Sequence, residues 1–235
     1  MKKIFLTTAL FCFAIITTCF AQRDVVSEER SVGSFDKINS CCGIDVYITE
    51  GTLSTLKVET NYEEMLDEII TRVKDDELEI SLKRNNRKGM RNLKMKVYVS
   101  ATGLKLIDAS SGSDIYSTNQ LNTDNIELSA SSGADITLDL KADNINCKAT
   151  SGSDIKLKGT AQFAKLRANS GADIKMRDMT VARADAKASS GSDIVLYVTD
   201  ELDANASSGA DITYYGNPKN VNKRASSRGD ITRKN

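Results

Sequence analysis

The stretch Ser131-Ser132-Gly133-Ala134-Asp135-Ile136 decides the fold of this chain, because close copies of it recur through the second half of the sequence. Aligned on the aspartate, successive copies lie 21, 19, 19, 20, 18 and 19 residues apart. A nearly fixed period of this size is typical of a solenoid in which each repeat forms one coil. The aspartates are Asp114, Asp135, Asp154, Asp173, Asp193, Asp211 and Asp230.

Other columns of the repeat are equally regular when positions are counted from the aspartate as position 0. Isoleucine always occupies position +1, alanine position −5 and serine position −3. Position −2 holds glycine in six copies and Arg228 in the seventh. These glycines are Gly112, Gly133, Gly152, Gly171, Gly191 and Gly209.

Apolar residues recur at positions −7, −5, +1 and +3, and this period of two predicts β-strands on both sides of a Ser-Gly corner. Glycine suits a positive φ there, and Asp and Ser side chains can bond nearby backbone groups. The serine column at −3 is expected to satisfy buried backbone at the corner. The remaining residues of each coil are predicted to supply a third short strand, with Leu121, Leu140 and Phe163 pointing inward.

These patterns predict an all-β fold, a right-handed parallel β-helix with coils of about 19 residues. The isoleucine column would fill the interior, and the alanine column would mark a close approach of facing sheets. The aspartates are one position out of phase with the isoleucines, so we expect them to face solvent.

Residues 22–100 predict a more irregular β portion. Gly43-Ile44-Asp45-Val46 preserves the corner pattern, with Ile38 at position −7 and Ile48 at +3, so it is interpreted as a diverged first coil. Insertions then interrupt the stack before Asp114. The expected organisation is a signal peptide over 1–21, this portion over 22–100 and regular coils over 101–235. Because no Gly/Ser linker separates the last two, a single domain over 22–235 is favoured.

Within the irregular portion, residues 56–59 predict a strand and Asn61 an N-cap for a short helical turn. Residues 71–82 predict a hairpin around Asp75-Asp76. A longer helix through Ile69, Ile70 and Val73 is the competing interpretation. Residues 93–99 predict an edge strand.

The N-terminus predicts export. Lys2 and Lys3 precede an apolar run over residues 4–16, which is the order of a signal peptide cleaved after Ala21. A lipid tether at Cys19 is the alternative. The remaining chain would carry 30 basic against 32 acidic residues, which gives no field for nucleic acid, and it has no further membrane-spanning run. The expected location is periplasmic, outer-membrane-associated or extracellular.

Residue types argue against several chemistries. The sequence has no histidine, which removes the commonest general base and metal ligand. Three cysteines remain after residue 21, and they predict neither a disulfide framework nor a zinc site. Adjacent Cys41 and Cys42 are not expected to bridge each other, and Cys147 is expected to be buried. No catalytic residue, cofactor or metal is assigned.

Three features nevertheless suggest a ligand. The aspartate column either forms turns or binds a cation weakly, calcium being the candidate. Arg228-Gly229-Asp230 is either the seventh corner, with its glycine displaced by one position, or an adhesive tripeptide. Tyr214 and Tyr215 either help to seal the stack or stack on carbohydrate.

The combination of Phe35-Asp36-Lys37-Ile38, Gly43-Ile44-Asp45-Val46-Tyr47-Ile48, the Ser-Gly-x-Asp-Ile corners and Tyr215-Gly216-Asn217-Pro218-Lys219 resembles the auto-transporter adhesin head (GIN) domain proteins of Bacteroidetes. The resemblance implies an exported β-helical protein without an established biochemical activity.

The leading functional hypothesis is a non-enzymatic, exported cell-envelope protein that acts as an adhesin-like or ligand-binding β-helix. A surface glycan or an envelope protein would be its partner. The alternatives are a polysaccharide-active β-helix enzyme and a calcium-stabilised structural module. The sequence identifies neither the ligand, nor the oligomeric state, nor the face used.

Overall fold

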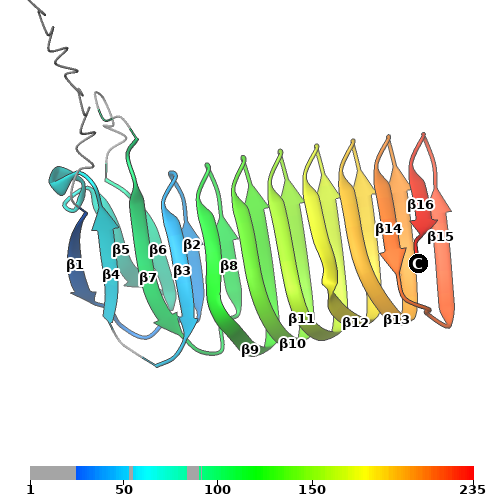
Figure 1. Ribbon diagram of the computed structural model, residues 1–235, viewed down its shortest axis with the longest axis horizontal. Coiled ribbons are helices and arrows are strands. Elements are labelled where there is room, and N and C mark those ends of the chain that lie inside the picture. The colour runs from blue at the N-terminus through cyan, green and yellow to red at the C-terminus, as the bar shows by residue number, and fades with distance from the viewer. Residues whose placement is uncertain (1–24, 53–54, 84–89, 91) are drawn as a thin grey trace, which may run out of the picture.

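The computed structural model describes residues 25–52, 55–83, 90 and 92–235, and shows a flattened β-solenoid of about seven coils (Figure 1). The sixteen strands among these described residues belong to one hydrogen-bonded sheet. The predicted signal peptide, its cleavage after Ala21 and the lipid tether at Cys19 lie outside the described residues.

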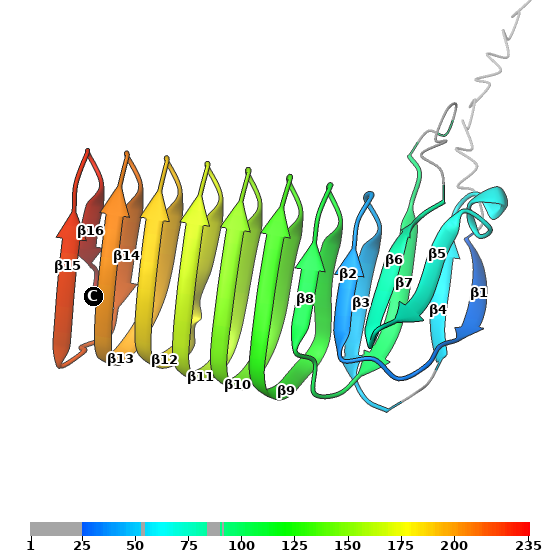
Figure 2. The same ribbon diagram turned by 180° about the vertical axis from the view of Figure 1, so that it is seen from behind.

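The regular coils are built from five long strands: β9 (Asp114–Ser131), β10 (Asp135–Thr150), β11 (Asp154–Asn169), β12 (Asp173–Ser189) and β13 (Asp193–Ser207). Each runs along one face of the solenoid, bends at its lower edge and returns along the other face (Figures 1 and 2). The predicted third strand is therefore wrong, since the bend lies inside one continuous strand. Leu121 and Leu140 are buried as expected, but Phe163 is only half-buried because Ala164 takes the inward place.

Two faces result. The first halves of β9–β13 begin with the aspartate column and form what we call the Asp face, which is the near side in Figure 1. The second halves form the Arg face, named after Arg167, which is the near side in Figure 2. In Figure 1 the near strands run downward, the far strands run upward and the coils advance to the right, so the solenoid is right-handed as predicted.

The coils stack in parallel and in register, aspartate on aspartate and isoleucine on isoleucine, through β14 (Asp211–Tyr215) and β16 (Asp230–Arg233). The isoleucines at +1 are at most 8% exposed in all seven copies, so they form one interior column. The alanines at −5 are buried in six copies, whereas Ala225 of β15 (Asn220–Ala225) is exposed in the last coil. The interior column predicted from the repeat is confirmed.

The upper corner of each coil is a type I′ turn, in which the residues at −3 and −2 both have positive φ. In one corner Ser132 and Gly133 have φ values of 55° and 70°, and the Ala134 amide donates to the Ser131 carbonyl at 3.2 Å. The glycine amide also donates to the serine carbonyl of the next corner, as from Gly133 to Ser151 at 3.2 Å. The corners are thereby joined along the solenoid.

The serines at −3 were predicted to hydrogen-bond buried backbone groups. This prediction is wrong, because both central residues of the turn lie outside the solenoid interior and these serines are exposed. The hydroxyls that do bond buried backbone groups stand at −1. Ser153 donates to the Ala130 carbonyl at 2.8 Å and accepts from the Thr150 amide at 3.1 Å, and Ser192 repeats both contacts two periods later. Alanine fills position −1 in the intervening coils, where Ala134, Ala172 and Ala210 are buried.

The diverged first coil consists of β2 (Lys37–Ser40) and β3 (Asp45–Glu50), which pair with β8 (Leu106–Ala109) and β9. Ile38 and Ile48 are fully buried, so its predicted alignment with the regular coils holds. On its other side stand β1 (Val26–Ser31), β4 (Thr55–Thr60), β5 (Ile69–Lys74), β6 (Glu77–Leu82) and β7 (Met95–Ala101). The predicted insertions therefore form an N-terminal end of mixed parallel and antiparallel pairing.

Some of the local predictions for this N-terminal end are confirmed and others are wrong. The hairpin is confirmed, because β5 and β6 are antiparallel and Asp75 and Asp76 both have positive φ; the competing longer helix is wrong. A 3-10 turn, η1 (Glu63–Met65), occurs where a helical turn was expected, but no side chain caps it. Asn61 instead bonds the backbone of Asn92 and Lys94. β7 is not an edge strand, because it lies between β3 and β4.

For the cysteines, the prediction about Cys41 and Cys42 is wrong, and the predicted burial of Cys147 is confirmed. Cys41 and Cys42, at the first upper corner, are joined by a disulfide bond, although their adjacency argued against one. Cys147 is fully buried in the interior column at −7, where burial raises the pKa of its thiol far above the usual range.

Thiol labelling should report both arrangements. In the folded chain starting at residue 22 we expect iodoacetamide to modify none of Cys41, Cys42 and Cys147, because the first two are oxidised and the third is a buried thiol. A mild reductant should expose the first two, and denaturant should add the third. Peptide mass spectrometry measures each site, and labelling of Cys147 in the folded protein would contradict its place in the core.

Candidate functional site

The aspartate column lies along the top of the Asp face, one strand apart from coil to coil, as the register shows. Its carboxylates accept backbone hydrogen bonds: the Asp135 amide donates to Asp114 at 3.3 Å, and the Asp154 amide to Asp135 at 3.1 Å. Lys175 pairs with Asp154 at 2.8 Å and with Asp173 at 3.1 Å. The column therefore ties neighbouring coils together at their corners.

The described residues contain no group of three or more His, Cys, Asp and Glu side chains arranged to hold a metal ion. Desolvation, and then the charges of Asp173 and Asp211, raise the pKa of Asp193 above its ordinary value. Desolvation also raises the pKa of Asp135, with the charges of its neighbours adding to it. Mutual repulsion thus persists along the column.

Replacing Asp193 with Asn should stabilise the fold slightly at pH 7. A carboxylate whose pKa is raised on folding opposes folding above that pKa, and this penalty disappears as pH falls through it. Because the side chain is exposed, we expect a gain of roughly 0.3–0.5 kcal/mol, most of the shift being screened by solvent. Urea unfolding at pH 7 and pH 3 measures it. A gain that persists at pH 3, where the carboxylate is mostly protonated, would show that its charge is not the cause.

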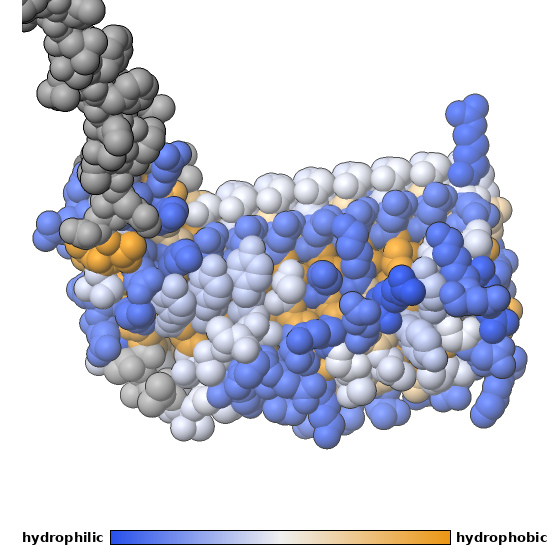
Figure 3. Space-filling model, viewed as in Figure 1, coloured by the Kyte–Doolittle hydropathy of each residue, from blue (hydrophilic) through white to orange (hydrophobic). Residues whose placement is uncertain are grey.

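Figure 3 views the Asp face and shows an even row of pale, uncharged groups along its upper edge, above a band of hydrophilic groups. The tripeptide Arg228-Gly229-Asp230 belongs to this edge. Ser227 and Arg228 have φ values of 50° and 68°, so the last corner is the same type I′ turn. Gly229 is required at −1, since a Cβ there would lie 2.6 Å from the Ala206 backbone. The displaced glycine of the seventh corner thus has a packing reason.

The tyrosines near the C-terminal end are engaged by cations. Tyr214 is 5% exposed, with the Lys223 ammonium 4.6 Å from its ring centroid. The Arg177 guanidinium lies 4.5 Å from the ring centroid of Tyr215. Tyr214 is therefore part of the interior and cannot offer its ring to a sugar.

A polar groove lies at the lower edge of the solenoid. It is lined by the connection between β7 and β8, residues 102–105, and by the bends within β9, β10 and β11. It consists of two adjoining cavities of about 570 and 460 Å³ that share Lys105 and Asn125. The first opens on the bend and the second on the lower part of the Arg face. Their lining side chains include Asn122, Asp124, Asn125, Lys141, Asp143, Asn144, Asn146, Thr160, Gln162 and Phe163.

The register builds this groove, since Asn125, Asn144 and Phe163 occupy one outward column on three successive strands. The Asn144 Nδ2 atom donates to Asn125 Oδ1 at 2.9 Å. Both side chains are exposed, and the remaining amide donor and acceptor atoms are available to a ligand. Lys105 is held by Asp36 at 2.6 Å, and this contact raises its pKa.

The groove therefore combines amides and hydroxyls, which bond sugar hydroxyl groups in both directions, with the half-buried ring of Phe163. The sequence did not identify it. Outward columns differ from coil to coil, and the interval between corners falls from 21 to 19 residues in this region. The signal that was available is the run of Asn residues at 122, 125, 144 and 146.

Known structures share this architecture. An adhesin from Bacteroides fragilis, described as putative, superposes with a TM-score of 0.82 at 22% identity, covering 91% of this chain and 98% of its own. A protein from Parabacteroides distasonis, described as a putative lipid binding protein, gives 0.71 at 19% identity, with 90% and 97% covered. A putative adhesin from Parabacteroides merdae gives 0.70 at 17% identity, with 90% and 96% covered. At these identities the likeness establishes the fold.

No curated protein sequence is significantly similar to this chain. In the described part of the chain, no helix is long and apolar enough to cross a membrane. Residues 34–218 match the model of the family described as putative auto-transporter adhesin, head GIN domain, which spans most of the chain and agrees with the resemblance of its corner motifs. The chain therefore belongs to the head GIN domain family.

Proposed function

We propose that this protein is an exported, non-enzymatic envelope protein that binds glycan in the groove at its lower bend. The observation that carries the proposal is the outward column of Asn125, Asn144 and Phe163, which places two amides and an aromatic ring in line beside polar bends. The amides of this column can bond the hydroxyl groups of a pyranose ring as donors and acceptors, and the aromatic ring can pack against its apolar face.

Family membership and the names of two of the three similar structures support an adhesive role rather than catalysis. The acidic residues that line the groove, Asp124, Glu127 and Asp143, are exposed. A glycosidase acid needs a raised pKa, which burial commonly supplies, and a second carboxylate at a defined separation across the scissile bond. The proposed activity is therefore retention of a glycan without cleavage.

A glycan array probed with the chain from residue 22 onward tests the proposal, followed by calorimetry on the strongest ligand. Asn144→Ala removes the central amide and should weaken binding at least tenfold. Phe163→Ala should do so about fivefold. Thr137→Ala, which changes an outward residue at the middle of the Asp face on the same strand as Asn144, serves as the control and should leave the affinity within twofold.

A reducing-end assay on each bound polysaccharide separates binder from enzyme. No product is expected after prolonged incubation. Release of sugar ends would overturn the non-enzymatic part of the proposal. Affinity that is unchanged in both groove variants, with intact circular dichroism spectra, would remove the groove from it.

A further inference from the structure

We infer that the glycan held by the groove is acidic, and that its carboxylate, sulfate or phosphate groups bind a cationic panel on the Arg face. This inference rests on the glycan-binding function proposed above and assigns the class of glycan. The panel consists of the outward side chains on the second halves of three strands: Asn144, Asn146 and Lys148 of β10, Phe163, Lys165 and Arg167 of β11, and Arg183, Asp185 and Lys187 of β12.

The register brings the cations of this panel together. Lys148, Arg167 and Lys187 stand opposite one another on adjacent strands, about 4.8 Å apart along the axis. Lys165 lies between Asn146 and Asp185, and Arg183 stands beside Phe163. Five cations thus share the panel with one carboxylate.

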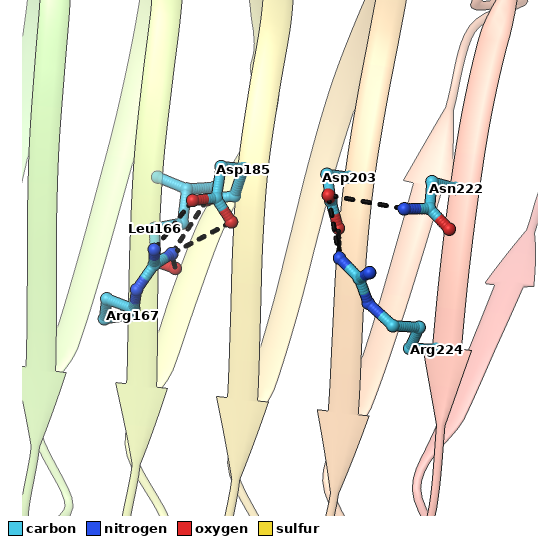
Figure 4. Close-up of polar contacts among 6 residues, drawn as sticks. All are labelled: Leu166, Arg167, Asp185, Asp203, Asn222 and Arg224. Atoms are coloured by element: carbon cyan, nitrogen blue, oxygen red, sulfur yellow. Dashed lines mark hydrogen bonds and ion pairs between the residues drawn. The ribbon is translucent and has the colours of Figure 1, made fainter.

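That single carboxylate is already engaged. Arg167 donates to Asp185 Oδ2 at 2.7 Å, and also to the backbone carbonyls of Leu166 at 2.8 Å and Asp185 at 3.1 Å (Figure 4). The other four cations, Lys148, Lys165, Arg183 and Lys187, are exposed, and none of them forms an ion pair with a described residue. Their mutual repulsion is relieved when an anion binds among them.

Along the Arg face the excess of positive charge is confined to β10–β12, because the exposed Glu127 of β9 stands opposite Asn146 on the groove side. Further along the Arg face, Asp203 of β13 accepts from Arg224 at 2.8 Å and from Asn222 at 3.4 Å (Figure 4), and Glu201 follows Arg183 in its column. On the opposite face of these strands, Lys158 pairs with Asp139, and Lys175 pairs with Asp154 of the aspartate column. A chain with no net formal charge therefore carries one basic surface.

An acidic polysaccharide fits this surface better than a bilayer or a nucleic acid does. The panel shares Asn144, Asn146 and Phe163 with the groove, so one linear chain can place sugar hydroxyls on the amides and acidic groups on the lysines. An interfacial bilayer site needs a broad apolar face, and Phe163 is the panel's only apolar side chain. Binding of a nucleic-acid duplex needs contacts to many phosphates. The panel covers only three strands, which is too small a surface for that many contacts.

The experiment compares polymers that share a sugar backbone and differ in their acidic groups: polygalacturonate with its methyl ester, and dextran sulfate with dextran. We expect the acidic member of at least one pair to bind fivefold or more tightly at low salt, and the advantage to shrink as salt rises. Lys165→Gln with Lys187→Gln should abolish most of that advantage. The matched control, Lys156→Gln with Lys158→Gln, removes the same charge from the Asp face and should change affinity less than twofold.

Each result has a distinct meaning. Equal binding of the charged and neutral members, sensitive to Asn144→Ala, overturns this inference and leaves the groove function standing. Absence of binding to every polymer here and every sugar on the array removes both. Equal competition by DNA or by phosphatidylglycerol vesicles would show a general polyanion surface and overturn the assignment to polysaccharide.

Discussion

Replacing Gly159 with Ala should destabilise the solenoid by more than about 3 kcal/mol. Gly159 has a φ of 116°, a conformation that L side chains rarely adopt. A Cβ there would lie 2.1 Å from the carbonyl oxygen of Leu140 on the preceding coil, so β10 and β11 would have to separate.

The matched control is Gly152→Ala, at the corner that precedes the same strand. Its φ of 66° is also positive, but no heavy atom lies within 4 Å of the added methyl group, so the cost should be about 1–2 kcal/mol from the backbone alone. Urea unfolding followed by circular dichroism compares the two. Equal losses would mean that the close approach of the coils does not govern the stability of β11.

Truncating Ile174 to Ala should cost about 3–5 kcal/mol, because the side chain is fully buried and its neighbours in the column, Ile155 and Ile194, cannot move to fill the cavity. Hydrogen exchange should show faster opening of the flanking coils before distant ones, as expected for a stack held by nearest neighbours.

Val195→Ala is the control for this prediction, since Val195 follows Ile194 on the same strand but points outward and is only half-buried. Its loss should stay within about 1 kcal/mol. If both substitutions cost the same, the isoleucine column would not be the main source of cohesion.

The interior of the fold was predictable because its physical requirements repeat. Every coil needs an isoleucine at +1 and a small residue at −5 to close the same space, so the sequence displays them at one period. The positions of the corners were predicted correctly, but the residue whose side chain points inward at each corner was not. A type I′ turn places two successive residues outside the solenoid interior. The next side chain that points inward is therefore that of Ser153, not that of Ser151.

The groove and the panel escaped prediction for the opposite reason. Their residues face solvent, where nothing forces one coil to match the next: Asn144, Phe163 and Arg183 share a column yet differ in chemistry. Formal charge was also misleading, because the balance of 32 basic and 32 acidic residues averages over two unlike faces. The insertions between Glu50 and Lys96 depend on antiparallel pairing with long-range partners, which no local period reveals.

The parallel stacking has a mechanical consequence. Hydrogen bonds between coils point along the solenoid axis, so a pull between the two ends loads the coil junctions one after another, and the least extensive junction yields first. The terminal strands β1 and β16 each pair with one strand only, over six and four residues. Between them, the least extensive junction joins the N-terminal end to the regular coils, where β3 meets β9 only over Val46–Ile48 and β2 meets β8 over four residues. Once the terminal strands have detached, the protein would part there and leave the regular coils as one intact block.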